Sequence, residues 1–230
     1  MLKLGLRLGL RLGLKCVPKL VLMPGARPRR ARQPLQARHS RGFTLIELMV
    51  TLVLMSLLLG LAAPNFRVWV RNAQVRTVSD ALQNGMRLAQ SEALQRSRQV
   101  VFFLTNESDC TTAIAAAMNG VNWGIRTVPM TAGESSAVVQ CGVLSDVASG
   151  VAITGPAAVC FNSMGRQTEN SSTGVTSGNC TLAVSGVSTY NVAATGADRP
   201  LRVLLTLGGQ SRLCDPARML SDGAPDGCPA

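Results

Sequence analysis

The stretch from Arg41 to Leu48, RGFTLIEL, contains the side chains whose positions suggest chemistry most directly. Gly42 has no side chain, so it suits the narrow cleft of a protease that cuts beside a membrane. Cleavage after Gly42 leaves a new α-amino group on Phe43, at the edge of an apolar run. Glu47 places a carboxylate one turn into that run, where a charge costs about 2.5 to 3.5 kcal/mol unless it is protonated or paired. The amine of Phe43 on a neighbouring copy is a natural partner for this carboxylate.

Glu47 also has a plainer interpretation. Its carboxylate could lie near enough to the membrane surface to be hydrated, or be tolerated near the end of an ordinary signal anchor. Taken alone, the residue leaves both interpretations open, and the surrounding pattern has to decide between them.

Six of the seven cysteines follow the apolar run, and Cys16 precedes it. An even number of well-spaced cysteines in a chain with an export signature predicts disulfides in an oxidising compartment. The pair favoured first is Cys214 with Cys228, because they are close in sequence and bracket a tail rich in Pro, Gly and Asp. The remaining candidates are Cys110, Cys141, Cys160 and Cys180. Metal binding is the competing interpretation, but no C-x-x-C pair occurs and the single histidine, His39, lies before Gly42.

The chain after Gly42 argues against an enzyme. It has no histidine, no clustered carboxylates in a motif and no Gly-rich phosphate loop. We therefore expect no catalytic residue, no cofactor and no bound metal.

Charge is distributed very unevenly along the chain. Eleven of the 23 basic residues precede Phe43 with no acidic residue among them, so the remaining 12 face all 12 acidic residues. The net charge of +11 therefore belongs to residues 1–42, which read as a cleaved basic leader, and not to the mature chain. Whether this leader starts at Met1 or at Met23 stays open. A nucleic-acid partner is not expected from overall charge.

Residues 43–63 form 21 positions with one charge, which is enough for a helix to cross a hydrocarbon core of roughly 30 Å. The arginine-rich leader predicts that its own side stays cytoplasmic and that the C-terminal part faces the periplasm. Pro64 predicts a kink, after which residues 64–98 continue as an amphipathic helix. The apolar face of this continuation consists of Val78, Leu82, Gly85, Ala89 and Ala93.

Residues 99–230 are rich in short β-type runs separated by Gly, Asn, Ser and Pro. The predicted strands are 99–104, 122–128, 137–144, 157–161, 180–184 and 200–207. The expected architecture is α+β, with the second half of a long N-terminal helix packed on an antiparallel β-sheet.

The basic leader, Gly42, the run from Phe43 to Leu48, the apolar segment and Pro64 together resemble the class III signal of type IV pilins and type II secretion pseudopilins. The resemblance implies that a prepilin peptidase cuts after Gly42 and methylates Phe43. It also implies that Glu47, at the fifth mature position, recruits the subunit into a growing filament. The implied partners are other pilins through their N-terminal helices, the peptidase and an inner-membrane assembly platform.

Three later stretches resemble the GspH/FimT branch of minor pilins and pseudopilins. They are MRLAQSEALQRSRQVVF in the helix, FNSMGR at Phe161 to Arg166, and GGQSRLCDP at Gly208 to Pro216. The resemblance implies a pilin-like fold and a subunit near the filament tip that helps initiate assembly, in a type IV pilus or in type II secretion.

DNA reception during natural transformation is an alternative function, because some members of this branch bind DNA through basic residues in a C-terminal GRxR motif. The corresponding stretch here reads GGQSR, so only Arg212 matches, with Arg218 nearby. Phosphate affinity scales with the number of neutralising cations, and three aspartates lie close by: Asp215, Asp222 and Asp226. Specific DNA binding is therefore not expected.

Overall fold

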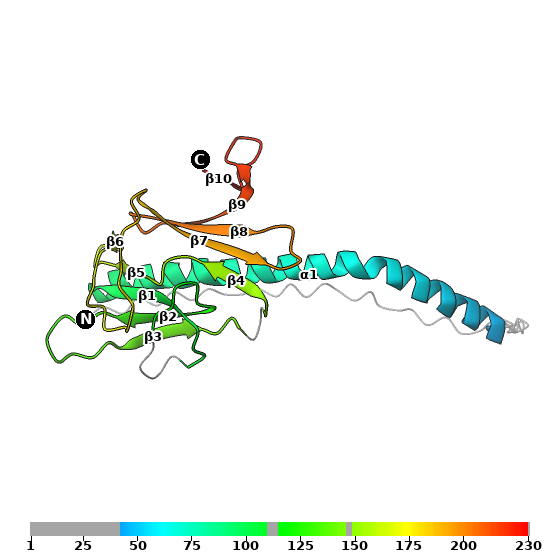
Figure 1. Cartoon of the computed structure of the whole chain (residues 1–230), viewed down its shortest axis with the longest axis horizontal. Coiled ribbons are helices and arrows are strands. Elements are labelled where there is room, and N and C mark those ends of the chain that lie inside the picture. Colours follow the sequence, from blue (N-terminus) through cyan, green and yellow to red (C-terminus); the bar gives the residue numbers. More distant parts are fainter. Residues whose placement is uncertain (1–41, 110–114, 146–148, 230) are drawn as a thin grey trace, which may run out of the picture. The chain divides into compact units, whose positions relative to one another are not determined.

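The computed structural model describes residues 42–109, 115–145 and 149–229, apart from the side chains of residues 62–64. Helix α1 (Leu45–Arg96) is followed by strands only (Figure 1). These are β1 (Val100–Thr105), β2 (Asn122–Thr127), β3 (Val138–Gly142), β4 (Val151–Thr154), β5 (Ala158–Phe161), β6 (Gln167–Thr168), β7 (Val187–Ala194), β8 (Leu201–Thr206), β9 (Ser211–Met219) and β10 (Gly227–Cys228).

The second half of α1 buries the apolar face that the sequence predicts. Val78, Leu82, Ala89 and Ala93 are at most 1% exposed, and Val75 and Met86 extend the same face. At Gly85 the packing is close, because a Cβ there would lie 3.0 Å from Cε2 of Phe102. The predicted amphipathic continuation of the helix is thus confirmed, with spacing that follows the helical period.

The first half of α1 is apolar and uncovered. Every large apolar side chain from Leu45 to Leu61 is at least 50% exposed. Over the described part of the chain, no single straight helix has the length and apolar composition needed to cross a membrane. The segments Leu45–Leu61 and Asn65–Arg96 meet these criteria together, with a bend of 48° between them. The predicted kink at Pro64 falls at this bend, but the side chain of Pro64 lies outside the description.

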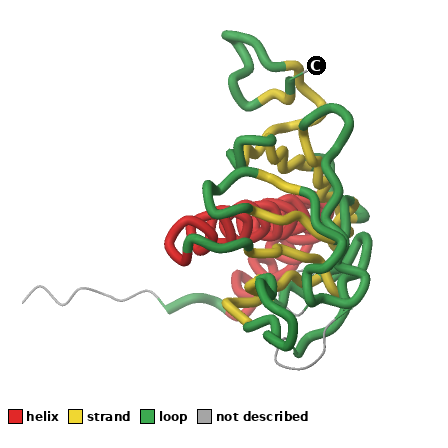
Figure 2. The backbone as a smooth tube through the Cα atoms, turned by 90° about the vertical axis from the view of Figure 1, so that its left-hand side faces the viewer, coloured by secondary structure: helices red, strands yellow, loops and turns green. Residues whose placement is uncertain are grey.

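The strands form two five-stranded sheets instead of the single sheet expected. The first has the order β3-β2-β1-β5-β6, and the second has the order β10-β9-β8-β7-β4. Neighbouring named strands pair antiparallel, except that β9 and β10 pair parallel. Viewed along α1, the strands form a stack beside the helix (Figure 2). One core joins α1 to both sheets, through residues such as Phe102 of β1 and Tyr190 of β7, so the α+β class is confirmed.

Five of the six predicted strands are confirmed within one or two residues, as β1, β2, β3, β5 and β8. The prediction at 180–184 is wrong. Cys180 makes only an isolated bridge with Asn170, and the side chain of Val184 at the other end of the run is fully exposed. The sequence reading missed β7, whose inward positions alternate as a strand requires but include polar types. Ser188 is one of these, and its hydroxyl donates to Gln167 at 2.9 Å.

The face of the first sheet that turns away from α1 has its own smaller core. It includes Phe103 of β1, Val128, and the disulfide-bonded Cys160 and Cys180. The disulfide ties β5 to the segment that failed to form a strand. This covalent link holds that segment over the sheet without a hydrogen-bonded ladder.

Candidate processing and assembly site

Residues 42–44 precede α1, and no atom outside its neighbours lies within 4 Å of a Cβ built at Gly42. Phe43 is 82% exposed. Glu47 lies in the first turn of α1, where a negative charge interacts favourably with the partial positive charge of the helix N-terminus. The predicted N-terminus Phe43 and the predicted assembly carboxylate of Glu47 are four positions apart in the sequence.

The three stretches that carry the second resemblance meet at one side chain, Gln90 of α1. Its Nε2 donates to the carbonyl oxygen of Gly165 at 2.9 Å and to that of Gly208 at 3.4 Å. Gly165 belongs to the FNSMGR turn, in which the Asn162 side chain accepts from the backbone N–H groups of Met164 and Arg166 at 3.0 Å each. The stretches thus form a junction between α1, the turn after β5 and the turn after β8.

Gly209 is the tightest point of this junction. Its φ is +82°, which favours glycine, and a Cβ there would lie 2.0 Å from the carbonyl oxygen of Gly165. The sequence pattern alone does not predict the roles of Gln90 and Gly209. The adjacent glycines before a strand were the available signal for a tight turn.

The C-terminal turn is closed by the disulfide that was favoured from the sequence, Cys214–Cys228. Arg212 braces the same turn, because its Nη2 donates to the carbonyl oxygens of Pro225 at 2.8 Å and Gly227 at 3.4 Å. Cys141 is also disulfide-bonded, whereas Cys110 lies outside the described residues.

The DNA-binding alternative gains no support from this arrangement. The guanidinium of Arg212 is engaged by backbone carbonyls, and Arg218 forms an ion pair with Asp226 at 3.3 Å. A cavity of about 590 Å³ lies nearby between α1 and β9, and its charged lining has both signs. The lining residues include Arg76, Asp80, Arg87, Arg199, Asp215 and Asp226.

No cluster that could hold a metal ion occurs in the described ranges, where no group of three His, Cys, Asp or Glu side chains comes together. Among the residues that the structure describes, the pKa values of Glu134 and Tyr190 are shifted from their ordinary values. Hydrogen bonds from the backbone N–H of Met130 and from the side chain of Arg98 lower the pKa of Glu134. Complete burial raises the pKa of Tyr190 above its usual range.

Comparison with known proteins gives two family matches. Residues 37–63 match the model of the prokaryotic N-terminal methylation motif. Residues 78–209, more than half of the chain, match the model of type II transport protein GspH. No curated protein matches.

Among solved structures, the chain is similar to the type IV minor pilin FimU of Pseudomonas aeruginosa in two crystal forms. Both FimU structures are 13% identical to this chain, with TM-scores of 0.40 and 0.43. The matched regions cover 61% and 64% of this chain and 96% of each FimU chain. The solution structure of E. coli GspH is 12% identical to this chain, with a TM-score of 0.33. The matched region covers 63% of this chain and 89% of the GspH chain.

Proposed function

The chain belongs to the GspH family of type II transport proteins, a family of pilin-like subunits, and from that premise we propose how it is processed and assembled. Prepilin peptidase cuts after Gly42 and methylates the new N-terminus at Phe43. The mature subunit is held in the bacterial inner membrane by residues 43–63, with its N-terminus cytoplasmic and residues 99–230 periplasmic. It then joins other pilins through α1 and helps initiate or cap a type IV pilus or a type II secretion pseudopilus.

The observation that carries the proposal is the uncovered first half of α1. Its apolar side chains from Leu45 to Leu61 are exposed along the whole segment, and the methylation-motif match spans the same residues. Such a surface is stable only in lipid or against other apolar helices. A bilayer and then a bundle of pilin helices supply those two surroundings in turn.

Glu47 is the residue that promotes incorporation of a new subunit into this helical bundle. A carboxylate one turn into the apolar segment is costly in lipid unless it is paired. The α-amino group of Phe43 on an adjacent subunit comes level with Glu47 when the two helices are staggered by four residues, about 6 Å along the axis. Pairing of the carboxylate with the amine favours a subunit in the filament over a subunit free in the membrane. The inner-membrane assembly platform is the partner that supplies the incoming subunits.

The test compares Glu47→Leu with Ser56→Ala, which removes a polar group from the same exposed segment without changing charge. The Ser56 hydroxyl bonds only to its own helix, at 2.8 Å from the carbonyl oxygen of Val53. Both variants should carry a processed N-terminus by mass spectrometry. The amount of the Glu47→Leu variant recovered in sheared filaments should be about tenfold lower. This corresponds to a loss of about 1.4 kcal/mol in the free energy of incorporation. Equal recovery of both variants contradicts the role of Glu47.

Genomic neighbours separate the two kinds of filament. Genes for pilus-tip proteins beside this one indicate a type IV pilus. Genes for a secretin and a secretion platform indicate type II secretion.

A further inference from the structure

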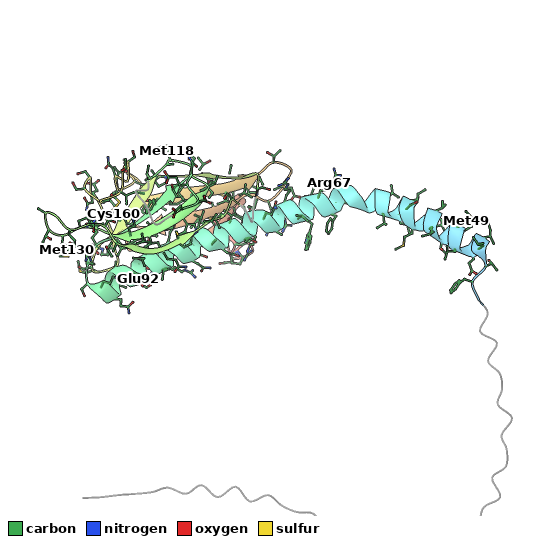
Figure 3. All side chains as sticks on the ribbon, turned by 90° about the horizontal axis from the view of Figure 1, so that it is seen from below. Met49, Arg67, Glu92, Met118, Met130 and Cys160 are labelled. Atoms are coloured by element: carbon green, nitrogen blue, oxygen red, sulfur yellow. A yellow bond between two sulfur atoms is a disulfide. The ribbon has the colours of Figure 1, made fainter. Side chains whose placement is uncertain are left out.

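Two aromatic rings stand uncovered directly after the apolar segment. Phe66 is 61% exposed and Trp69 is 66% exposed, and their ring centroids lie 5.8 Å apart. They are three residues apart on α1, so they lie on the same side of the helix. Figure 3 labels Arg67 on this stretch, which runs beyond the strands toward Met49. Two large exposed rings on a helix that no other element covers indicate a surface that binds a partner.

Two arginines belong to the same region: Arg67 lies between the two rings in sequence, and Arg199 lines a cavity with Trp69. Over the described residues, the side chains of Arg67 and Arg199 form no ion pair or hydrogen bond. Arg199 is held near Trp69 because Asn72 ties its loop to α1: the Asn72 side chain accepts from the backbone N–H groups of Asp198 at 3.1 Å and Arg199 at 3.2 Å. Trp69 and Arg199 line one cavity of about 460 Å³ together with Asp198, whose carboxylate accepts from the Asn72 side-chain amide. Two guanidinium groups against this one carboxylate leave a positive local charge, so the partner that suits this surface is anionic as well as amphipathic.

The length of the apolar segment places this group of residues at a membrane surface. The 21 residues from 43 to 63 span about 31 Å as a helix, which matches a hydrocarbon core of about 30 Å. Phe66 to Trp69 follow within the next turn or two. At that depth tryptophan rings are favoured among lipid carbonyl groups, and guanidinium groups bind phosphates.

We infer that Phe66, Arg67, Trp69 and Arg199 form a collar that binds phospholipid headgroups on the membrane face opposite the leader. The rings lie at the level of the lipid carbonyls, and the two guanidinium groups pair with phosphates, preferably of anionic lipids. The collar rests on the membrane anchor of the proposed function. It keeps the subunit at a defined depth before α1 is withdrawn into a filament.

The experiment uses the two tryptophans of the chain, because Trp123 is buried and reports only background. The full-length protein is reconstituted in vesicles of phosphatidylethanolamine and phosphatidylglycerol, and incorporation is checked by co-flotation. Brominated lipids then quench tryptophan emission at different depths. Bromine near the glycerol end should quench more than bromine near the chain end. Trp69→Phe should still float and should show no depth-dependent quenching.

Energy transfer from Trp69 to dansyl-labelled headgroups tests the charge preference. Labelled phosphatidylglycerol should be enriched near Trp69 over labelled phosphatidylethanolamine on the order of fivefold. Arg67→Gln with Arg199→Gln should abolish this enrichment. The matched control, Arg87→Gln with Arg96→Gln, removes the same charge further along α1 and should retain it.

Each outcome decides a separate point. Protein that does not float overturns the anchor and the collar together. Protein that floats with unquenched Trp69 overturns the collar and leaves the filament proposal standing. Quenching of Trp69 with no lipid preference overturns the phosphate pairing. Shielding of Trp69 only when another pilin is added makes that surface a subunit contact and also overturns the collar.

Discussion

Gln90 on α1 donates a 2.9 Å hydrogen bond to the carbonyl oxygen of Gly165, 75 residues further along the chain. Gly209 closes over the same carbonyl, so a helix and two turns from different sheets share one contact point. This junction holds the end of α1 at a defined position against both sheets. It therefore contributes to fixing the strand-rich part against the second half of α1.

Gly209→Ala should be much more destabilising than Gly196→Ala. Both glycines have φ near +83°, at +82° and +84°, but a Cβ at Gly196 has nothing within 4 Å. Gly196→Ala therefore measures backbone strain alone, at about 1 kcal/mol, and Gly209→Ala adds overpacking of a further 1 to 3 kcal/mol. Chemical unfolding of the detergent-solubilised protein, followed by near-ultraviolet circular dichroism, gives both values. Equal losses would contradict the tight junction.

Arg212→Ala should loosen the C-terminal turn without changing affinity for DNA. The substitution removes donors to the carbonyl oxygens of Pro225 and Gly227, and we expect a loss of about 1 kcal/mol in unfolding free energy. Arg212→Lys keeps the charge but not the forked geometry, so it should lose a similar amount. A gel-shift with residues 70–230 supplies the second readout. Tight, salt-dependent DNA binding that disappears in Arg212→Ala would reverse this interpretation.

Tyr190→Phe should be neutral or stabilise the protein by up to about 1 kcal/mol. The ring is fully buried, with an edge-on contact to Phe102 at 6.5 Å, and the hydroxyl has no hydrogen-bond partner in the described part of the chain. Removing an unpaired buried hydroxyl relieves its desolvation cost. Tyr190→Ala, by contrast, removes the ring and should cost about 3 to 5 kcal/mol. A clear loss in Tyr190→Phe would reveal a buried water bound to the hydroxyl.

Glu134 should make stability depend on pH in the acidic range. Its carboxylate accepts from the backbone N–H of Met130 at 2.8 Å and from Arg98 at 2.6 Å, which lowers its pKa below the ordinary value of 4.5. Because the folded-state pKa is the lower one, the stabilisation is complete above 4.5 and is lost as pH falls through the lowered pKa. Glu134→Gln should thus be less stable than the parent protein at pH 7. The difference should vanish well below 4.5, and a difference that persists there would contradict the assignment.

Gly42→Ala should block cleavage, because any side chain at this position fills the space that the peptidase cleft allows for glycine. Gly60→Ala is the matched control within the apolar segment, since a Cβ there also has nothing within 4 Å. Mass spectrometry of the Gly60 variant should find N-methylated Phe43 at the start, and the Gly42 variant should retain its leader. A mature protein that begins at another residue would contradict the proposed processing.

The sequence by itself determined the features that depend on local pattern. The run after Gly42, the position of Glu47 and the buried face through Leu82 all follow from composition and from the 3.6-residue helical period. The Cys214–Cys228 pairing was also accessible, because the two cysteines are near in sequence. The uneven charge is likewise a property of the sequence alone, with eleven basic residues and no acidic residue before Phe43.

Only the tertiary structure decided which distant groups meet. The strands divide into two sheets that share one core with the apolar face of α1. The sequence of a strand does not specify which strand it pairs with, so this division could not be predicted. Gln90 reaches a carbonyl 75 residues away, and Arg212 is turned to backbone carbonyls instead of solvent. These contacts are set by chain topology, because the free energy of a long-range hydrogen bond depends on the whole core that brings its partners together.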